Sequence, residues 1–418
     1  MKTDQRFALA VDEMDGGLRL RFSAVSACEI GEDELALCDI GFEELCAMSR
    51  ASAAFRSAFA EGAPGDLDRS VIANGWQSWS FGGELGLDER LRTPIFGLFR
   101  EFSQRPGRLA GRGEVLSHFY LGLRAGAERL FLVSRNAGSA PLAFRLRKRD
   151  LSIGVEAFAR GARLEAGKEI AEIRIFSREG YFAAKDAFAR IFAGFRLFDR
   201  LSFLGSAGRL VPGGYESWYN HYTHISAPLI ERDLEAIGGC DNLISEYYIK
   251  RGKPTVFQID DGWERTVGEW EPDAGPEKFP EGMKPLAAKI EEKGYIPGLW
   301  LAPVIVNKSS AVFRERQEWL LRDEGGKLVR AGYNPGWEGP FYALDLSVPE
   351  VEEYLARLFE RVVEDWGYRY LKLDFLYAAF LPGVRANGGA AYEHYERVFG
   401  RITSRVKDKA GRPVAWLG

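Results

Sequence analysis

The sequence is poor in the residues that build disulfide frameworks and metal sites. Its four cysteines are Cys28, Cys38, Cys46 and Cys240. They form no Cys-x-x-Cys pair and are too few to staple a chain of 418 residues, so we expect free thiols in a reducing compartment. Among the four histidines, His221 and His224 are three positions apart, but no cysteine or carboxylate pattern accompanies them. We expect no metal site and no cofactor.

A strong charge of one sign and a long apolar run are also missing. The formal net charge is -4, which gives neither the basic footprint of a nucleic-acid-binding protein nor a polybasic membrane surface. No run of 18 apolar residues occurs, and the first residues lack the apolar core of a signal peptide. We therefore expect a cytoplasmic protein that binds neither nucleic acid nor membrane.

Aromatic residues, in contrast, are abundant. They make up 13% of the chain and include ten tryptophans. Tryptophan and tyrosine combine an apolar ring with a polar group, so such an excess suits either a large core or a ligand with apolar and hydroxyl faces, such as a sugar ring. A length of 418 residues favours two domains over one.

The first 200 residues contain short runs of β-favouring residues separated by turn residues. Several runs alternate between apolar and polar side chains, which is typical of half-buried strands. The expected strands are Leu18–Phe22, Ser117–Leu123, Arg129–Arg135, Leu142–Arg149, Leu151–Phe158 and Glu169–Phe176. Short strands at this spacing predict an antiparallel β-sandwich over residues 1–200. Residues 181–195 have helical spacing instead and should form a connector near the end of this domain.

From about residue 210 the pattern changes to alternating strands and helices. The expected strands are Val211–Trp218, Thr255–Asp260, Tyr295–Pro303, Tyr368–Tyr377 and Pro413–Leu417; the expected helices are Leu229–Lys250, Met283–Lys293, Val351–Glu364 and Ala391–Lys409. This series predicts parallel strands, and an open doubly wound sheet or a (β/α)₈ barrel would fit it. No glycine-rich phosphate fingerprint follows the first strand, which disfavours a dinucleotide-binding sheet. We expect residues 201–418 to form a (β/α)₈ barrel of which about the first five strands are present.

The expected strand Tyr368–Tyr377 carries two charged residues, Lys372 and Asp374. Two positions apart in a strand, they lie on the same face. Burying a charge is costly unless it is paired or used. The pair is therefore either an internal ion pair or part of an active site, and its spacing does not decide between these readings.

Other polar and aromatic residues stand near the carboxyl ends of the expected strands, where barrel enzymes build their sites. Adjacent aspartates in a strand point to opposite faces, but Asp260 and Asp261 lie at a strand end and could both enter one pocket; alternatively, Asp261 only makes a turn with Gly262. Together, the residues near the ends of these strands are Glu216, Trp218, Asp260, Asp261 and Trp300. Rings for stacking on a ligand would come from Trp218, Trp263 and Trp300, with Trp76 or Trp79 from the first domain, although Trp76 and Trp79 could equally pack between the domains.

Glycoside hydrolysis with retention needs two carboxyl groups roughly 5–5.5 Å apart, one as nucleophile and one as acid/base. Asp374 suits the nucleophile, because an ammonium group nearby keeps a carboxylate ionised. No second carboxylate with an obvious acid/base environment is apparent in the sequence.

Several motifs in order resemble one known family. They are Trp76-Gln77-Ser78-Trp79, Ser217-Trp218-Tyr219, Gln258-Ile259-Asp260-Asp261-Gly262-Trp263, Gly268-Glu269-Trp270, Phe279-Pro280-Glu281-Gly282-Met283, Gly298-Leu299-Trp300-Leu301-Ala302-Pro303 and Leu371-Lys372-Leu373-Asp374. Together they resemble the microbial α-galactosidases of glycoside hydrolase family 36. The resemblance implies an N-terminal β-sandwich, a catalytic (β/α)₈ barrel and a small C-terminal β domain.

The resemblance also implies roles for single residues. Asp374 matches the nucleophile and Lys372 a residue that binds substrate hydroxyls, while Asp260 and Asp261 match the pair that binds the galactose 4- and 6-hydroxyls. Pocket-wall aromatics are matched by Trp218, Tyr219 and Trp300, and a capping loop by Trp76 and Trp79. The family's acid/base aspartate follows a sixth strand, beyond the motifs found here, so we expect an incomplete chain in which the acid/base residue is absent.

The expected function is a retaining α-galactosidase that hydrolyses terminal α-linked galactose of oligosaccharides through a glycosyl-enzyme intermediate. Two alternatives remain open. One is a related α-glycosidase or a galactosyl-transferring enzyme, because hydrolysis and transfer share that intermediate. The other is a sugar-binding protein without catalysis, which follows from the missing acid/base residue.

Overall fold

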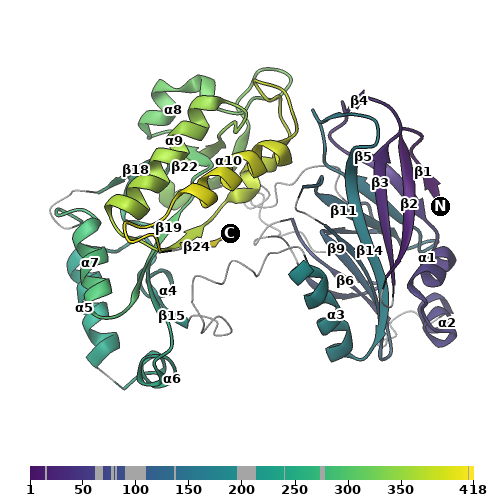
Figure 1. Ribbon diagram of the computed structural model, residues 1–418, viewed down its shortest axis with the longest axis horizontal. Coiled ribbons are helices and arrows are strands. Elements are labelled where there is room, and N and C mark those ends of the chain that lie inside the picture. Colours follow the sequence, from purple (N-terminus) through teal and green to yellow (C-terminus); the bar gives the residue numbers. More distant parts are fainter. Residues whose placement is uncertain are drawn as a thin grey trace. The chain divides into compact units, whose positions relative to one another are not determined.

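The computed structural model describes residues 1–14, 17–61, 69–76, 80, 82–89, 110–135, 138–194, 213–239, 241–273, 278–412 and 414–418. The chain forms two compact units (Figure 1). The N-terminal unit comprises Met1–Leu197 and Phe380–Glu396, and the second unit comprises Phe198–Ala379 and Arg397–Gly418. Trp79, which the sequence placed in a capping loop, lies outside the described residues.

Two antiparallel sheets make up most of the N-terminal unit. The five-stranded sheet has the order β1 (Lys2–Thr3), β5 (Leu35–Ile40), β12 (Ile153–Ala157), β11 (Leu142–Arg147) and β8 (Glu114–His118). The seven-stranded sheet has the order β2 (Phe7–Met14), β3 (Gly17–Ala24), β14 (Glu169–Glu179), β10 (Glu128–Ser134), β9 (Tyr120–Ala125), β6 (Arg69–Ala73) and β7 (Gly83–Gly86). A short pair, β4 (Cys28–Glu29) with β13 (Arg163–Leu164), stands apart from them.

The two sheets share one apolar core, as the expected sandwich requires. Strand β10 shows how alternation divides its side chains between two environments. Leu130 and Leu132 enter the core between the sheets, whereas Phe131 and Val133 pack on the opposite face. That opposite face contacts α3 (Tyr181–Gly194), the helical connector expected from the sequence (Figure 1).

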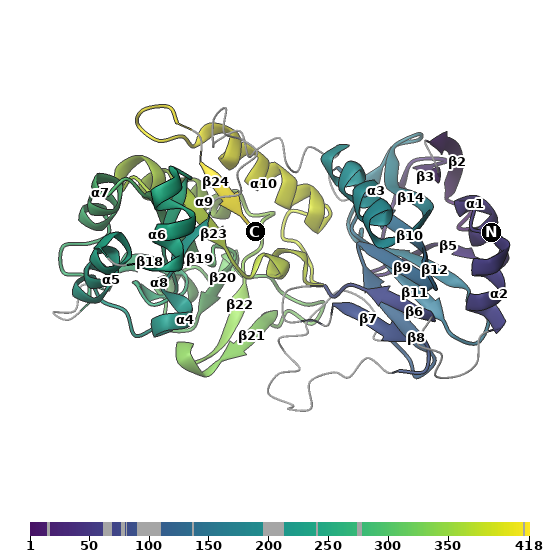
Figure 2. The ribbon, with the colours of Figure 1, turned by 90° about the horizontal axis from the view of Figure 1, so that it is seen from below.

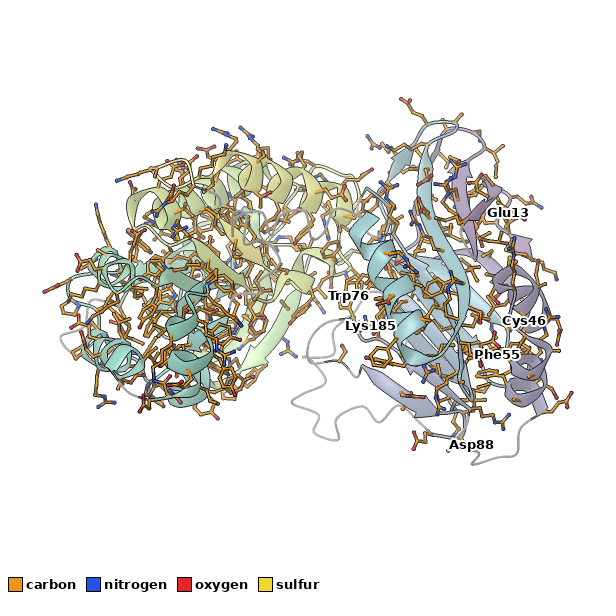
Figure 3. All side chains as sticks on the ribbon, turned by 60° about the horizontal axis from the view of Figure 1, so that its bottom comes forward. Glu13, Cys46, Phe55, Trp76, Asp88 and Lys185 are labelled. Atoms are coloured by element: carbon orange, nitrogen blue, oxygen red, sulfur yellow. The ribbon has the colours of Figure 1, made fainter. Side chains whose placement is uncertain are left out.

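Two helices in this unit were not expected. Helix α1 (Phe42–Ser49) and helix α2 (Ala53–Glu61) follow strand β5, in a region where the sequence predicted mainly strands. The buried residues of α1 include Phe42, Leu45 and Cys46, which have the i, i+3, i+4 spacing of an amphipathic helix. Stacked rings of Phe42, Phe55 and Phe59 join the two helices. Figure 3 labels Cys46 and Phe55, one on each helix.

The single strand expected at Ser117–Leu123 is wrong. Phe119 has a φ of 69°, in the left-handed region that a phenylalanine seldom occupies. The chain turns there, so that β8 joins the five-stranded sheet and β9 joins the seven-stranded sheet. A change of backbone conformation at one bulky residue leaves no trace in hydrophobic alternation, which explains why the pattern suggested one strand.

The second unit is built on a parallel sheet of five strands. Their order is β15 (Gly213–Glu216), β16 (Thr255–Ile259), β19 (Ile296–Leu301), β23 (Tyr370–Leu373) and β24 (Ala415–Leu417). Spatial order thus follows chain order without the reversal that defines a doubly wound sheet, and it is the order found in a barrel. The described strands form an open sheet. Glycines suit β15, because a Cβ on Gly214 would lie 1.9 Å from the Val256 carbonyl oxygen.

Helices connect these strands (Figure 2). Those before β19 are α4 (Trp218–His221), α5 (Ala227–Gly239), α6 (Leu243–Tyr247), a 3₁₀ turn (Ile249–Arg251) and α7 (Lys284–Glu292). Those after it are α8 (Ala311–Glu315), a 3₁₀ turn (Gln317–Trp319), α9 (Pro349–Glu360) continued by a π-helical turn (Arg361–Asp365), and α10 (Ala391–Arg405). The expected helix Leu229–Lys250 is divided into α5, α6 and the 3₁₀ turn. Among the described helices, none has both the length and the apolar character needed to cross a bilayer.

Two small antiparallel sheets, neither of them predicted from the sequence, interrupt the parallel series. One is the hairpin β17 (Glu264–Thr266) and β18 (Glu269–Pro272). The other has the order β20 (Ile305–Asn307), β22 (Gly339–Ala343) and β21 (Arg330–Asn334), with a 3₁₀ turn, Pro335–Trp337, between β21 and β22. We call this three-stranded sheet the insert sheet.

The expected strand Tyr368–Tyr377 is too long. Strand β23 ends at Leu373, and residues Leu376–Phe380 form a 3₁₀ helix. Phe375 between them has a φ of 57°, which a non-glycine residue adopts only at a cost. Asp374 therefore lies at the point where the chain leaves the sheet and enters this 3₁₀ helix.

Candidate active site

Polar side chains gather where the parallel strands of the second unit end. Glu216 is the last residue of β15, Asp260 follows β16 directly, and Asp374 follows β23. The register aligns these ends, because Glu216 pairs with Gln258, and Trp300 of β19 pairs with Lys372 of β23. The sequence-predicted strand-end residues are therefore brought to one edge of the sheet.

Lys372 joins two of these carboxylates. Its Nζ donates to Asp260 Oδ2 at 2.8 Å and to Glu216 Oε2 at 3.3 Å. Burial by itself would lower the pKa of Lys372, but hydrogen bonds and charges from Asp260 and Glu216 outweigh it and raise that pKa. The ammonium therefore stays charged. Of the two readings left open for Lys372, an ion pair is present, but its partners are Asp260 and Glu216 and not Asp374.

Asp260 is buried and almost fully bonded. Besides Lys372, its Oδ2 accepts from Gln258 Nε2 at 2.6 Å, and its backbone N–H donates to Ser217 Oγ at 2.9 Å. Its Oδ1 accepts from the Asp261 N–H at 3.0 Å. Burial raises the pKa of this carboxyl group, and Lys372 opposes that rise. These bonds hold one orientation of the Asp260 side chain.

Asp374 is held by neutral donors. The Trp300 indole donates from Nε1 to Asp374 Oδ2 at 3.3 Å, and the Phe375 N–H donates to Oδ1 at 2.9 Å. The Asp374 N–H continues the sheet ladder by donating to the Leu301 carbonyl at 2.8 Å. The left-handed backbone of Phe375 thus accompanies a hydrogen bond from the Phe375 N–H to the Asp374 carboxylate. This hydrogen bond offsets part of the cost of the unusual φ at Phe375.

Asp261 lies in a different environment from its neighbour Asp260. Its Oδ2 accepts from the Trp337 indole at 2.9 Å, and the carboxyl group of Glu264 lies beside it. Burial and the charge of Glu264 raise the pKa of Asp261, and burial also raises the pKa of Glu264. The two acids therefore titrate as a coupled pair, in which ionisation of one opposes ionisation of the other.

Gly262 allows the chain to turn after this aspartate pair. Its φ is 112°, and a Cβ there would lie 2.6 Å from the Thr223 carbonyl oxygen. Only glycine fits such a close approach with this backbone. The turn suggested for Asp261 and Gly262 is therefore present, and Asp261 also has the specific side-chain partners that a simple turn does not need.

The predicted aromatic residues are spread over different environments. Trp300 is only 2% exposed and reaches Asp374 with its indole N–H. Trp263 is completely buried and packs on Trp270 and Trp366, so it supports the site from the core and presents no ring face to a ligand. Trp218 is half-buried, whereas Tyr219 is 80% exposed.

Trp76 belongs to the N-terminal unit and is buried there (Figure 3). Its ring stacks on Phe119 and meets the edges of His118, Phe158 and Phe380 at centroid separations of 5.2–6.0 Å. These contacts lie within that unit and account for the burial of Trp76.

The described residues contain no group of three or more histidine, cysteine, aspartate or glutamate side chains arranged to hold a metal ion. The chemistry of the strand-end cluster is that of carboxylates, one ammonium group and indoles.

Comparison with known proteins identifies the relatives of the chain. The Melibiase family model matches residues 249–385. An α-galactosidase of Escherichia coli is 26% identical over 160 residues, which cover 37% of this chain and 21% of the relative. α-Galactosidase C of Emericella nidulans is 29% identical over 187 residues, covering 39% and 22% respectively.

Solved structures resemble a much larger part of the chain. The α-galactosidase TtGalA of Thermus thermophilus, in complex with stachyose, is 27% identical with a TM-score of 0.60, and the match covers 94% of this chain and 68% of that one. The family 36 α-galactosidase AgaA of Geobacillus stearothermophilus is 15% identical with a TM-score of 0.52, covering 95% and 52%, and shows a shared fold. This chain is similar to α-galactosidases in part of its sequence and, over most of its length, in its fold.

The match to these α-galactosidases is uneven along the chain. The Melibiase segment contains Asp260, Asp261, Trp300, Lys372 and Asp374. The chain covers only about a fifth of the length of the curated relatives it matches, at 21% and 22%. Glu216 lies before residue 249, outside the matched segment, and the strand register places it beside that segment. Trp218 and Tyr219, at the start of α4, also lie outside the matched segment.

Two residues of the candidate site, Trp337 and Glu264, were not predicted from the sequence. Trp337 lies in a stretch for which no element was expected, and no local spacing pointed to it. Glu264 stands three residues after Asp261 and could have been noticed as a second acid beside the aspartate pair. Glu216 was recognised as a strand-end residue, but its bond to Lys372 follows from pairing between strands far apart in the chain.

Proposed function

We propose that this chain carries the nucleophile and the galactose-binding groups of a retaining α-galactosidase. The observation that carries the proposal is the position of Asp374. It lies in a segment matched by the Melibiase model, at the carboxyl edge of a parallel sheet, and two neutral N–H donors hold its carboxylate. Lys372, Asp260 and Glu216 lie at the same edge.

The chemistry follows from this arrangement. Asp374 attacks the anomeric carbon of a terminal α-linked galactose, and the bond from that carbon to the departing oxygen breaks as a glycosyl ester forms on the Asp374 carboxylate. A second carboxyl group must protonate the leaving oxygen and later activate water; the proposal assigns that role to no residue of this chain. The two N–H donors orient the Asp374 carboxylate for attack. The Lys372 ammonium, which the sequence suggested as the partner of Asp374, bonds to Asp260 and Glu216 instead.

The remaining polar residues are proposed to bind the sugar. By the family resemblance, Asp260 and Asp261 accept hydrogen bonds from the galactose 4- and 6-hydroxyls, and Lys372 donates a hydrogen bond to a hydroxyl. Trp300, Trp218 and Tyr219 would form pocket walls, with Trp76 and Trp79 as a cap. The substrate class is a galactose-containing oligosaccharide; stachyose, bound by the Thermus thermophilus relative, is of this kind.

The proposal extends to the architecture and the location of the protein. The five strands in chain order support the first part of a (β/α)₈ barrel over residues 201–418, after a β-sandwich domain over residues 1–200. Cys28, Cys38 and Cys46 are free thiols among the described residues, which supports a reducing, cytoplasmic compartment.

A test uses an α-galactoside with an activated aryl leaving group, which departs with little help from an acid. The 418-residue chain should release a burst of aryl alcohol equal to the amount of enzyme, with one galactosyl group attached to the peptide that contains Asp374. Asp374→Asn should abolish burst and labelling, whereas Asp365→Asn, at an exposed carboxylate, should keep both. A normal burst from Asp374→Asn would contradict the proposed nucleophile.

The same experiment separates the alternatives. A galactosyl-transferring enzyme would give the burst and then pass galactose to an added sugar acceptor in preference to water. A non-catalytic sugar-binding protein would bind galactose without any burst, and that outcome would replace the enzymatic proposal.

A further inference from the structure

Trp337 is a buried tryptophan held firmly in place. It ends the 3₁₀ turn between β21 and β22 of the insert sheet, and it is 8% exposed. The Asn307 side chain donates to its carbonyl oxygen, and Glu338 after it adopts a left-handed φ of 60°. Because its backbone is hydrogen-bonded and its ring is buried, the Trp337 side chain can serve as a rigid support.

The indole of Trp337 orients the Asp261 carboxyl. Its Nε1 donates to Asp261 Oδ2 at 2.9 Å, and both side chains are buried. No N–H donor among the described residues reaches the other oxygen, Oδ1, and the Glu264 carboxyl group lies beside Asp261. Among the described residues, the indole is therefore the N–H donor that orients this carboxyl group, next to its contact with Glu264.

The ring of Trp337 also contacts both supports of Asp374. Its centroid lies 5.1 Å from the Phe375 ring and 6.1 Å from the Trp300 ring. Phe375 and Trp300 supply the two N–H donors that hold the Asp374 carboxylate. One side chain of the insert sheet thus links two strand ends of the proposed site.

We propose that Trp337 is a positioning residue that holds the Asp261 carboxyl in the orientation needed to bind one hydroxyl of a galactose ring. This inference rests on the proposed function, because it takes Asp261 to be a galactose-binding residue. The insert sheet then has a role in the proposed site: it delivers an indole N–H to a residue 76 positions earlier in the chain.

Trp270 provides a matched comparison. It is also buried, and its ring contacts Trp300 at a centroid distance of 6.0 Å. However, its Nε1 has no hydrogen-bond partner among the described residues. Replacing Trp270 with phenylalanine removes a similar ring volume without removing a bond to a carboxyl group, so it measures the effect of packing alone.

The test measures binding of three sugars to the full 418-residue chain by calorimetry: galactose, 4-deoxygalactose and 6-deoxygalactose. Trp337→Phe should weaken galactose binding about tenfold or more, since a hydrogen bond to a charged or buried group is lost. The loss should be smaller for the deoxy sugar that lacks the hydroxyl bound by Asp261. Asp261→Asn should likewise lose less affinity for one of the two deoxy sugars than for galactose, and that sugar is the one that lacks the hydroxyl bound by Asp261. Trp270→Phe should bind galactose nearly as tightly as the wild type does.

Two results would overturn the inference. One is an unchanged galactose affinity in Trp337→Phe; the other is an equal loss for all three sugars, which marks general disruption and not a directed hydroxyl contact. If Trp337→Phe lacks a native near-ultraviolet circular dichroism spectrum, Trp337→Tyr takes its place with the same expectations. A wild-type chain that binds none of the three sugars would overturn the proposed function, and this inference with it.

Discussion

Replacing Lys372 with methionine should destabilise the second unit strongly and in a pH-dependent way. The Lys372 ammonium lies 2.8 Å from Asp260 Oδ2 and 3.3 Å from Glu216 Oε2. Methionine keeps most of the apolar stem and removes the charge. Asp260, whose side chain is 3% exposed, then remains as a buried carboxylate without its cation.

The magnitude follows from burial. Removing one partner of a fully buried ion pair costs about 3–5 kcal/mol, because the remaining charge is left uncompensated. The side chains of Lys372 and Glu216 are 26% and 31% exposed, so water reaches part of this cluster. We therefore expect a loss of about 2–4 kcal/mol in the free energy of unfolding at neutral pH.

The loss should grow as the pH rises. Without Lys372, burial and Glu216 raise the pKa of Asp260 further above its value in the unfolded chain, so the folded state holds a proton that the unfolded state releases. A raised folded-state pKa of an acid costs stability above the unfolded pKa of about 4, and the cost disappears below it. The variant should therefore approach the wild type near about pH 4 and fall furthest behind near about pH 8.

Urea unfolding followed by tryptophan fluorescence measures the effect. Lys289→Met is the control, because Lys289 pairs with Glu231 at 2.5 Å on the surface, with side chains 44% and 41% exposed. It should cost no more than about 0.5 kcal/mol. Adding Asp260→Asn to Lys372→Met should restore much of the stability at high pH. A loss no larger than that of Lys289→Met, or no recovery in the double variant, would refute the reasoning.

Two further predictions concern the aspartate pair. Glu264→Gln should flatten the fall in stability between about pH 5 and pH 8, because burial and the charge of Glu264 raise the pKa of Asp261 and so make the folded state lose stability as the pH rises. Equal slopes of the free energy of unfolding against pH, measured by urea unfolding of variant and wild type, would contradict this. Gly262→Ala should lower the free energy of unfolding by about 2–4 kcal/mol, because residue 262 has a φ of 112° and an added Cβ would lie 2.6 Å from the Thr223 carbonyl oxygen. An unchanged urea midpoint would contradict this and show that the turn can relax.

Several features of the fold could be predicted because they are written in local spacing. Alternation in Leu130–Val133 places two side chains in the sandwich core and two against α3, as a half-buried strand requires. The apolar spacing of residues 181–194 likewise gave a helix. The helical spacing of Phe42, Leu45 and Cys46 was equally readable and was overlooked among the strand patterns around it.

Left-handed backbone conformations at bulky residues were not predictable in the same way. Phe119 and Phe375 adopt left-handed φ values of 69° and 57°, and each ends a strand that the hydrophobic pattern would continue. Phenylalanine has no intrinsic preference for this conformation, so surrounding contacts must impose it. The strand ends, and with them the exact setting of Asp374, therefore depended on the folded structure.

The strand-end positions of four residues in the candidate site could be predicted from local pattern alone: Asp260 and Asp261 after one strand, and Lys372 and Asp374 at another. Chain order and β-favouring runs suffice for that, because they reflect local burial and spacing. The partners of these side chains, in contrast, follow from the folded chain. Strand register brings Glu216 to Lys372 across 156 positions, and the insert sheet brings Trp337 to Asp261 across 76. Such pairings depend on how distant strands align, and local periodicity carries no information about that alignment.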